Sequence, residues 1–445
     1  MPSDAPRLLV ITYYFPPDGS VGGLRWAGIA KYLTRLGWKV SVLTAARQDG
    51  SDPAGDAQVE WCPRRRTLMD YYEVLRRSNG RSHSSFETAS GVAPPSTRPG
   101  LLRVLRREVG ACLTLPDWSR GWILRAALRA RSLVRRFQPQ FVVSSGPPHS
   151  AHLVAGMATM GSSVRWLIDL RDPWAGPFPT AWLSHSMYGT RAFHVLTPRL
   201  ERLAFRAAHG VIANTPELAE ALATKYPEVA IASIRNGVDP ECLPPPAPHP
   251  YPGLGIAYVG TLYGSRDLGP VMQALHVFLQ GHPEAAQAGS KLRVAGHADP
   301  PNALAREEEI TSLGLERHVE VLGLLPRAQA LDLLSRSRLA VVLAQDWDVQ
   351  VPAKLYESMA MHIPTLVVAG EGSAAAVEGK RLGATVLDPS DIGGITRLLE
   401  HLWRNETPQS PPRGAPMTYA EIAALVQELL TGDGSRNGRP DRFGH

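Results

Sequence analysis

The sequence of 445 residues has few cysteines, and this limits the chemistry that it can support. Cys62, Cys112 and Cys242 are odd in number, lie far apart and form no Cys-x-x-Cys pair. The pattern therefore predicts neither a disulfide framework nor a cysteine metal site, and it is typical of a reducing compartment.

Long apolar runs are also missing. The longest uncharged stretch, from Phe141 to Val164, is interrupted by proline, serine, histidine and glycine, which argues against a helix that spans a bilayer. The N-terminal segment lacks a basic region ahead of an apolar run, so we expect no signal peptide. Any contact with a membrane is expected to be made from its surface.

The sequence is long and carries a net positive charge. A chain of 445 residues exceeds what one hydrophobic core supports, so we expect two domains. The formal net charge is +6, and arginines cluster between Arg64 and Arg136. This balance favours an anionic partner, such as a phosphorylated ligand, a lipid surface or a nucleic acid, although a solvated basic face accounts for it equally well.

Alternating strand and helix patterns indicate the fold class of residues 1–235. Short apolar and β-branched runs alternate with segments whose apolar residues recur at helical spacing. We expect strands at residues 7–14, 38–45, 141–145, 165–170 and 210–214, and helices at 24–36, from about Trp122, at 149–160 and at 192–208.

Two stretches interrupt this alternation. Residues 48–117 lose periodicity and fill with serine, proline, glycine and arginine, so we expect a partly mobile insertion at the edge of the first domain. Residues 236–252 are rich in proline, which sustains neither a helix nor a central strand, and they are expected to form an interdomain linker.

A second alternating block occupies residues 253–415, followed by a helix at 416–432 and a polar tail at 433–445 that we expect to be disordered. Two such blocks predict an α/β protein with two parallel sheets covered by helices. Within the second block we expect strands at 255–260, 291–296, 319–323 and 338–344 and in PTLVV and ATVL, and helices from Asp267, at 302–313, from Arg327 and in PAKLYESMA.

Loops at the carboxyl ends of the strands are where open α/β sheets bind ligands. Gly22 and Gly23 lie between the first strand and its helix, where bare amides can meet an anion, although glycine pairs more often make turns. Arg266 precedes the helix after the strand at 255–260 and can clamp two phosphate oxygens, although a surface arginine is the simpler interpretation.

The segment PAKLYESMA places a lysine where a helix disfavours it. Pro352 suits the first turn of a helix, so Lys354 falls in that turn, where the dipole opposes a cation unless an anion is bound. Glu357 lies one turn later on the same face and can accept hydrogen bonds from a diol such as ribose. The alternative is a surface Lys-Glu pair.

Several motifs together resemble the GT-B glycosyltransferases of the GT4 group, which are two-domain retaining enzymes with nucleotide-sugar donors. ITYYFPPDGSVGGLR is similar to their acceptor-side loop, VIANTPELAEAL and IRNGVD to the end of their first domain, and YVGTLYGSRDL to the first turn of their donor domain. LPDWSRGW, VSSGPPHSAHL and DLRDPW are similar to a branch that acts in O-antigen, capsule and exopolysaccharide assembly. The resemblance covers nearly the whole chain and implies two Rossmann-like domains facing a central cleft.

On the donor side, the resemblance implies that Arg266 and Lys354 neutralise the diphosphate and that Glu357 holds the ribose. The first two roles agree with the physics, because a departing nucleoside diphosphate builds negative charge that fixed cations stabilise. A UDP-sugar is the expected donor, with no cofactor and no metal, since no Asp-x-Asp motif stands in the appropriate loop. The other expected donor-side residues are Gly22, Gly23, Gly260, His297, Gly323 and Leu355.

On the acceptor side, Arg25 is expected near the cleft, and DLRDPW offers Asp169, Arg171 and Asp172 at a strand end. We predict that Asp172 binds or polarises the acceptor hydroxyl. The alternative is an N-cap or a buried carboxylate paired with Arg171.

The loop SSGPPHS adds further acceptor candidates. Ser145 and Gly146 can bind an acceptor phosphate, and His149 is a better candidate than His152, which lies inside the following helix.

One position departs from the family. Many members carry two glutamates with seven residues between them, and if Glu357 is the second, Val349 stands at the first. Asp346 and Asp348 are nearby but out of register. The branch that this chain resembles has a Pro-x-Lys-x-x-Glu pattern here, so we interpret the loss as lineage. A sugar-nucleotide epimerase of the same fold and an inactive nucleotide-sugar-binding scaffold remain alternatives.

Basic stretches at 64–66, 101–108 and 123–137 interleave arginine with leucine, tryptophan and isoleucine, which suits a helix lying on an anionic bilayer. A polyprenyl-diphosphate-linked acceptor would lie there, whereas no nucleic-acid reader module is present. We therefore expect a retaining, metal-independent glycosyltransferase of the hexosyl or N-acetylhexosaminyl type, with a lipid-linked or saccharide acceptor. It is expected to be cytoplasmic, peripheral at the inner face of the plasma membrane, and to act in cell-surface polysaccharide assembly.

Overall fold

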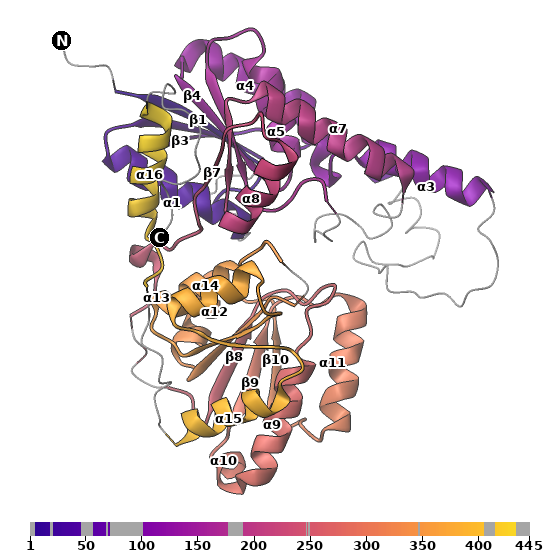
Figure 1. The fold of residues 1–445 in the computed structure, drawn as a ribbon, viewed down its shortest axis with the longest axis vertical. Coiled ribbons are helices and arrows are strands. Elements are labelled where there is room, and N and C mark those ends of the chain that lie inside the picture. Colours follow the sequence, from indigo (N-terminus) through magenta and orange to yellow (C-terminus); the bar gives the residue numbers. More distant parts are fainter. Residues whose placement is uncertain are drawn as a thin grey trace. The chain divides into compact units, whose positions relative to one another are not determined.

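The computed structural model describes residues 5–17, 21–45, 57–67, 70–71, 101–176, 190–245, 247, 250–345, 348–404 and 414–432. The chain divides into two compact units, one formed by Met1–Arg235 with Tyr419–His445 and the other by Asn236–Thr418 (Figure 1). The boundary falls at Asn236, where the regular sequence pattern breaks. The tail at 433–445 lies outside the described residues.

The first unit contains a seven-stranded sheet in the order β3-β2-β1-β4-β5-β6-β7, in which all neighbours are parallel. The direction of progression reverses between β1 and β4, and in open α/β sheets ligands bind at the carboxyl ends of the strands beside such a reversal. The strands are β1 (Arg7–Thr12), β2 (Lys39–Thr44), β3 (Gln58–Trp61), β4 (Phe141–Gly146), β5 (Arg165–Leu170), β6 (Gly210–Ala213) and β7 (Ile231–Ser233).

Helices of this unit form because one face of each buries small or apolar side chains. In α4, for example, Ala126, Ala130 and Leu133 recur at three- and four-residue spacing and are buried. The helices are α1 (Val21–Arg35), α3 (Leu101–Thr114), the 3-10 helix η1 (Trp118–Trp122), α4 (Ile123–Phe137), α5 (Ser150–Thr159), α7 (Arg191–Ala207), α8 (Pro216–Lys225) and α16 (Tyr419–Thr431).

The C-terminal helix α16 returns to the first unit and packs on α1 (Figure 1). The Tyr419 ring lies so close to Gly28 that a Cβ at this glycine would clash with it. Two hydrogen bonds tie α16 to the sheet side of the unit: Trp38 Nε1 donates to Gln427 at 2.9 Å and Arg165 donates to the Leu430 carbonyl at 2.7 Å. The last helix therefore stabilises the first unit.

Two regular elements lie within residues 48–117, where we expected a partly mobile insertion without periodicity. The edge strand β3 and the helix α3 both lie within it, while most of residues 48–100 lie outside the described part of the chain. The only buried residue of β3 is Glu60, which pairs with Arg129 at 2.9 Å and with Arg136. A four-residue edge strand whose buried member is a carboxylate carries no hydrophobic alternation, so the pattern could not reveal it.

The second unit contains a six-stranded parallel sheet in the order β10-β9-β8-β11-β12-β13. Here the reversal lies between β8 and β11. The strands are β8 (Gly255–Val259), β9 (Lys291–Ala295), β10 (Val319–Gly323), β11 (Leu339–Leu343), β12 (Thr365–Val368) and β13 (Thr385–Leu387), and the helices are α9 (Gly269–Gly281), α10 (Pro283–Gln287), α11 (Pro300–Ser312), α12 (Arg327–Ser335), α13 (Ala353–Ala360), α14 (Ala374–Leu382) and α15 (Ile392–Trp403).

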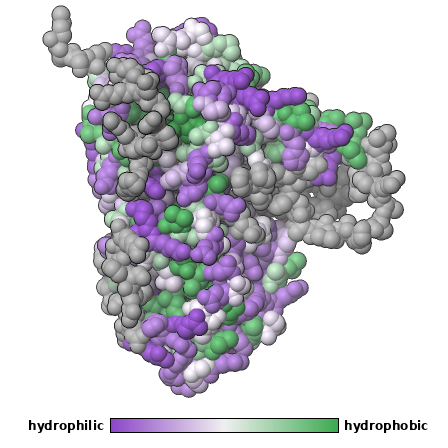
Figure 2. All heavy atoms as spheres, in the orientation of Figure 1, coloured by the Kyte–Doolittle hydropathy of each residue, from purple (hydrophilic) through white to green (hydrophobic). Residues whose placement is uncertain are grey.

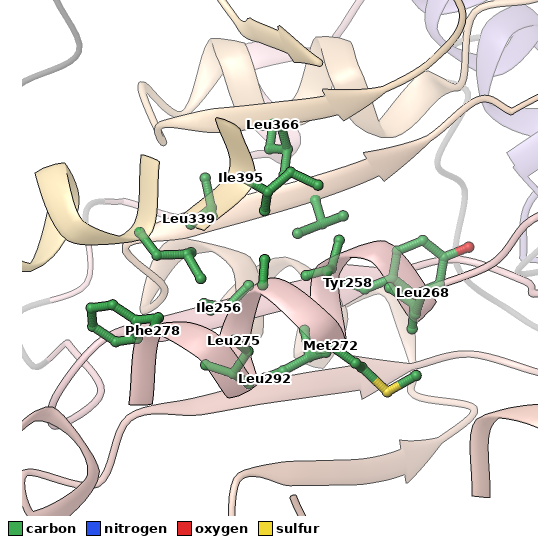
Figure 3. Packing of buried hydrophobic residues seen from close by; sticks show 14 of the residues in the cluster. Ile256, Tyr258, Leu268, Met272, Leu275, Phe278, Leu292, Leu339, Leu366 and Ile395 are labelled. Atoms are coloured by element: carbon green, nitrogen blue, oxygen red, sulfur yellow. The ribbon is translucent and has the colours of Figure 1, made fainter. Parts of the chain in front are cut away.

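Successive residues of β8 face opposite sides of this sheet. Ile256 and Tyr258 join the cluster under α9 and α15 that includes Met272 and Ile395, as Figure 3 shows. Ala257 and Val259 face the other side of the sheet and join a second cluster, which includes residues of α12. Burial on both faces is what a central parallel strand requires, and each fully buried side chain of this size contributes about 1.5–3 kcal/mol. The prediction of two parallel sheets covered by helices is confirmed.

Candidate active site

The loops after β8 and β11 are joined by one buried glutamine. Gln345 Oε1 accepts from the Asp267 backbone N–H at 2.9 Å, and Gln345 Nε2 donates to the Asp267 carbonyl at 2.8 Å. The Ser265 hydroxyl donates to the Gln345 carbonyl at 3.0 Å. The loop that carries Arg266 is thereby fixed to the end of β11, at the point where the strand order reverses.

Arg266 lies in the loop before α9, which begins at Gly269 and not at Asp267 as the sequence predicted. Its guanidinium stacks on the Tyr263 ring at 4.6 Å from the centroid, and Nη1 lies 3.5 Å from the Thr261 carbonyl. Burial raises the pKa of the nearby Tyr258 hydroxyl to about 12, although Arg266 acts in the opposite direction. Arg266 is thus a half-buried cation held at the carboxyl edge of the sheet.

Lys354 and Glu357 lie on α13, as predicted, and contact each other directly. Lys354 Nζ is 2.6 Å from Glu357 Oε2, while Nη1 of Arg327, the first residue of α12, is 2.6 Å from the other oxygen. Burial alone would raise the pKa of Glu357, but Lys354 and Arg327 together hold it below its usual value. The carboxylate is therefore ionised, buried and bound by two cations.

Glycines and one histidine occupy the ends of the three neighbouring strands. The Gly260 N–H donates to the carbonyl that ends β9 at 2.9 Å, and the Gly296 N–H donates to the Gly323 carbonyl at 2.7 Å. Gly296 has φ of +136° and its α-carbon faces the Gly260 carbonyl so closely that no side chain fits. His297 accepts from the Leu262 N–H through its carbonyl at 2.9 Å. The structure thus brings Gly260, His297 and Gly323 to one edge.

Leu355 has a packing role in the structure. Its side chain is fully buried in the core beside α13, and its N–H donates to the Pro352 carbonyl at 3.0 Å. Neither group is presented to a ligand at this edge. Val349, at the position of the missing glutamate, is also buried.

In the first unit, Gly22 and Gly23 belong to the first turn of α1, so the expectation that they lie in a loop before it is wrong. A Cβ at Gly22 would lie 2.6 Å from Nη1 of Arg171, and a Cβ at Gly23 would lie 2.9 Å from the α-carbon of Phe15. A Cβ at Gly23 would collide with the backbone of the loop after β1, whereas a Cβ at Gly22 would have to displace the Arg171 guanidinium, which packs on the helix backbone.

Asp169, which was predicted to bind the acceptor, is hydrogen-bonded to two other predicted acceptor-side residues, Arg25 and Ser145. Asp169 is fully buried and accepts from Arg25 Nε at 3.1 Å, from the Ser145 hydroxyl at 2.7 Å and from Trp26 Nε1 at 2.8 Å. The two terminal nitrogens of Arg25 donate to the carbonyls after β7 at 2.8 and 2.9 Å. This network fixes α1 to the carboxyl edge of the sheet.

Asp172 is partly exposed at the end of β5, next to buried Arg171. Arg171 donates through its backbone N–H to the Gly146 carbonyl at 2.9 Å and through its guanidinium to Gly146 and Pro147. Burial lowers the pKa of Arg171, and the charges of Asp172 and Asp169 oppose that effect. Of the two carboxylates in DLRDPW, Asp172 is the one that reaches the surface.

His149, His152 and Trp174 form a buried aromatic cluster. His149 stacks on Trp174 at 5.0 Å between ring centroids, and His152 Nδ1 lies 2.9 Å from the Ser144 hydroxyl. Within the described part of the chain, Nδ1 of His149, Nε2 of His152 and Nε1 of Trp174 make no hydrogen bond. Burial is the main reason why the pKa of His149 is well below its usual value and that of His152 is about 3, so both rings are neutral.

Asp117 was not predicted from the sequence. This fully buried carboxylate accepts from the Ser150 N–H at 2.8 Å and its hydroxyl at 2.7 Å, and it also caps η1 through Ser119. It thus caps the first turn of α5, which follows the Gly146 loop. The aspartate of LPDWSRGW therefore has a structural role. The sequence did not indicate this role, because Ser150 lies 33 residues further along the chain.

Among the residues that the structure describes, no three histidine, cysteine, aspartate or glutamate side chains are grouped closely enough to hold a metal ion.

Comparison with known proteins agrees with the fold. The family model described as Glycosyltransferase Family 4 matches residues 25–242, and the model described as Glycosyl transferases group 1 matches residues 255–405. No curated protein matches the sequence at a significant level.

Solved structures share the fold along almost the whole chain. Sucrose-phosphate synthase from Thermosynechococcus elongatus has a TM-score of 0.56 and 14% identity, with 96% of this chain and 95% of that chain covered. HepE from Anabaena in complex with UDP has a TM-score of 0.54 and 15% identity, with 96% and 95% covered. A UDP-N-acetylglucosamine 2-epimerase has a TM-score of 0.52 and 14% identity, with 99% and 100% covered.

At these sequence identities the solved structures show the fold, and the two family models show to which family the chain belongs. The models together account for most of both units, and each begins close to the start of its unit. The chain belongs to the GT4-type glycosyltransferases and has the GT-B fold, with two Rossmann-like parallel-sheet domains.

Proposed function

We propose that the protein is a retaining glycosyltransferase that moves a hexosyl or N-acetylhexosaminyl group from a nucleoside-diphosphate sugar, foremost a UDP-sugar, to a lipid-linked or saccharide acceptor. The observation that carries the proposal is the placement of Arg266, Lys354 and Glu357 beside the strand reversal of the second sheet. Two cations suit a diphosphate there. The solved HepE structure of the same fold contains UDP, which supports this choice of donor.

The chemistry follows from where charge develops. The bond between the sugar anomeric carbon and the phosphate oxygen breaks, and Arg266 and Lys354 stabilise the negative charge on the departing diphosphate. The acceptor oxygen forms the new bond on the same face, and its proton passes to the leaving phosphate. Asp172 orients and polarises the acceptor hydroxyl in this proposal, because it is the partly exposed carboxylate at the end of β5.

The membrane side of the proposal rests on α3. Leu105, Val109 and Leu113 recur every four residues and are exposed, with Arg106 and Arg107 exposed beside them. Figure 2 shows hydrophobic and hydrophilic residues side by side on the part of the first unit that α3 and α7 occupy. Such a face suits an anionic lipid surface, where a polyprenyl-diphosphate-linked acceptor lies.

No helix in the described ranges is both long and apolar enough to cross a bilayer. From the exposed face of α3 we propose that the protein acts at the cytoplasmic face of the plasma membrane, as a peripheral enzyme of cell-surface polysaccharide assembly.

Thermal-shift measurements with UDP, GDP, ADP, TDP and their common sugars test the donor site. Selective stabilisation by one nucleoside diphosphate is expected, and Lys354→Ala should abolish it, because the lost charge-assisted contact is worth roughly 1.5–3 kcal/mol. Exposed Lys380, in the last turn of α14, provides the matched control Lys380→Ala. If Lys354→Ala binds the nucleotide as the wild type does, the diphosphate does not lie at α13.

Incubation with the donor that binds then separates the remaining alternatives. Release of UDP with formation of a new glycoside supports transfer, whereas release or sugar inversion without an acceptor supports the epimerase alternative, whose fold the chain also shares. Nucleotide binding without transfer, release or inversion supports the inactive nucleotide-sugar-binding scaffold, whereas binding of no nucleotide contradicts the proposed donor site.

A further inference from the structure

Two cations bind one buried carboxylate in the second unit, although one cation would neutralise it. Glu357 is 7% exposed, and its oxygens contact Lys354 Nζ and Arg327 Nη1 separately, each at 2.6 Å. The two cations come from different helices and remain partly exposed, Lys354 at 18% and Arg327 at 31%. The trio carries a net charge of +1.

Both cations also stand where a helix disfavours them. Arg327 is the first residue of α12 and Lys354 the second of α13, so each lies at the positive end of a helix dipole. Glu357 offsets this cost for both residues. A carboxylate with two cations can lose one of them without becoming a buried, unpaired charge, which is strongly unfavourable.

We propose that Arg327 is a positioning residue of the nucleotide-sugar site, which keeps Glu357 ionised and fixed while Lys354 moves from Glu357 to the donor diphosphate. This inference rests on the proposed function. The two cations are suited to different parts: the planar guanidinium of Arg327 holds its donors in a rigid array, whereas the ammonium of Lys354 sits on a flexible stem. We therefore expect Lys354 to exchange partners and Arg327 to remain bound to Glu357.

A proton count distinguishes this exchange from a merely structural ion pair. Lys354 from α13 and Arg327 from α12 are the charged groups that act on the Glu357 carboxylate in the described part of the second unit. With Arg327 present, departure of Lys354 leaves the carboxylate paired and ionised. Without Arg327, departure of Lys354 would strand the charge, so Glu357 would take up a proton and binding would strengthen as the pH falls.

Calorimetric titration with UDP at pH 8, in two buffers of different ionisation enthalpy, measures this proton count. We expect wild-type protein to take up no proton, and Arg327→Gln to bind about tenfold to a hundredfold more weakly with a proton uptake that the wild type lacks and that grows as the pH is lowered. Arg327→Lys should restore most of the affinity and abolish the uptake. Arg317→Gln, in the exposed turn before β10 at the opposite edge of the same sheet, should behave as the wild type.

The double variant Arg327→Gln/Glu357→Gln guards against a trivial loss of folding. Its carboxylate is gone, so it should bind UDP without proton uptake, and its unfolding transition can be compared with that of the single variant. Wild-type affinity and proton count in Arg327→Gln would overturn the inference while leaving the donor site intact. Wild-type protein that binds no nucleoside diphosphate overturns the proposed function, and this inference with it.

Discussion

Arg25 Nε lies 3.1 Å from Asp169 Oδ1, and both side chains are buried. The pair joins the first turns of α1 to the end of β5, and Trp26 and Ser145 complete the coordination of the carboxylate. A fully buried carboxylate that accepts three hydrogen bonds from α1 and β4 holds these elements in place.

Asp169→Ala should therefore lower the free energy of unfolding, because the carboxylate has a structural role. Removal of one partner leaves the Arg25 charge buried and unpaired, which costs about 3–5 kcal/mol in the free energy of unfolding. Urea denaturation measures this loss. Arg25→Met/Asp169→Leu, which removes both charges, should recover a large part of it, and a loss below about 1 kcal/mol for the single variant would contradict the structural role.

Sequence periodicity was sufficient for most strands of the two sheets, but not for β3 and β7 and not for the contacts that assemble the site. The strands at 141–145 and 338–344 were placed to within one residue at each end because buried parallel strands are continuous apolar runs. Arg327 and Gln345 were not identified, since each matters through a partner 30 or 78 residues away. Local patterns carry no information about such pairs.

The same limit explains the acceptor side. Ser145 and Asp169 are polar residues at strand ends, which the sequence rightly places at the carboxyl edge. Whether such a residue faces a ligand or a neighbouring side chain depends on packing between β4, β5 and α1. Asp172, three residues after Asp169, differs from it in exposure and not in chemical type.

Asp172→Asn should impair transfer while leaving donor binding unchanged. The amide is similar in shape but cannot attract the acceptor proton as a carboxylate does, so we expect kcat to fall about a hundredfold. Product formation with saturating donor measures kcat, and the thermal shift with the nucleotide serves as the control. An equal loss in both measurements would place Asp172 outside the acceptor site.

The buried histidines predict how stability depends on pH. His149 and His152 have depressed pKa values when folded, about 3 for His152, whereas an unfolded histidine titrates near about 6.5. Their neutral state therefore costs nothing above about pH 6.5, and stability is lost as the pH falls from there towards 3, at up to about 1.4 kcal/mol per pH unit for each ring. His152→Gln should unfold with a shallower pH dependence, by about one proton.

Urea unfolding between pH 7 and pH 4 provides that comparison, with wild type and variant measured in the same buffers. The slope of the free energy of unfolding against pH gives the difference in bound protons directly. An unchanged slope in His152→Gln would mean that this imidazole does not stay neutral when folded.

Finally, the exposed face of α3 predicts salt-dependent binding to anionic vesicles. The face cannot serve the core of its own unit, because the opposite side of α3 already packs on α7: buried Ala111 contacts Phe193, and Glu108 accepts from the Arg191 and Ala192 N–H groups at 2.9 and 2.8 Å. Leu105→Asp should therefore leave folding intact and weaken binding to phosphatidylglycerol vesicles by about tenfold or more, since a buried leucine contributes about 1.5–3 kcal/mol. Leu324, exposed in the second unit, provides the control Leu324→Asp.

Arg107→Gln should weaken binding mainly at low salt, because each arginine near an anionic surface adds about 1 kcal/mol that screening removes. Binding of the wild type that is equal on phosphatidylcholine vesicles, or unaffected by Leu105→Asp, would mean that α3 does not meet the membrane.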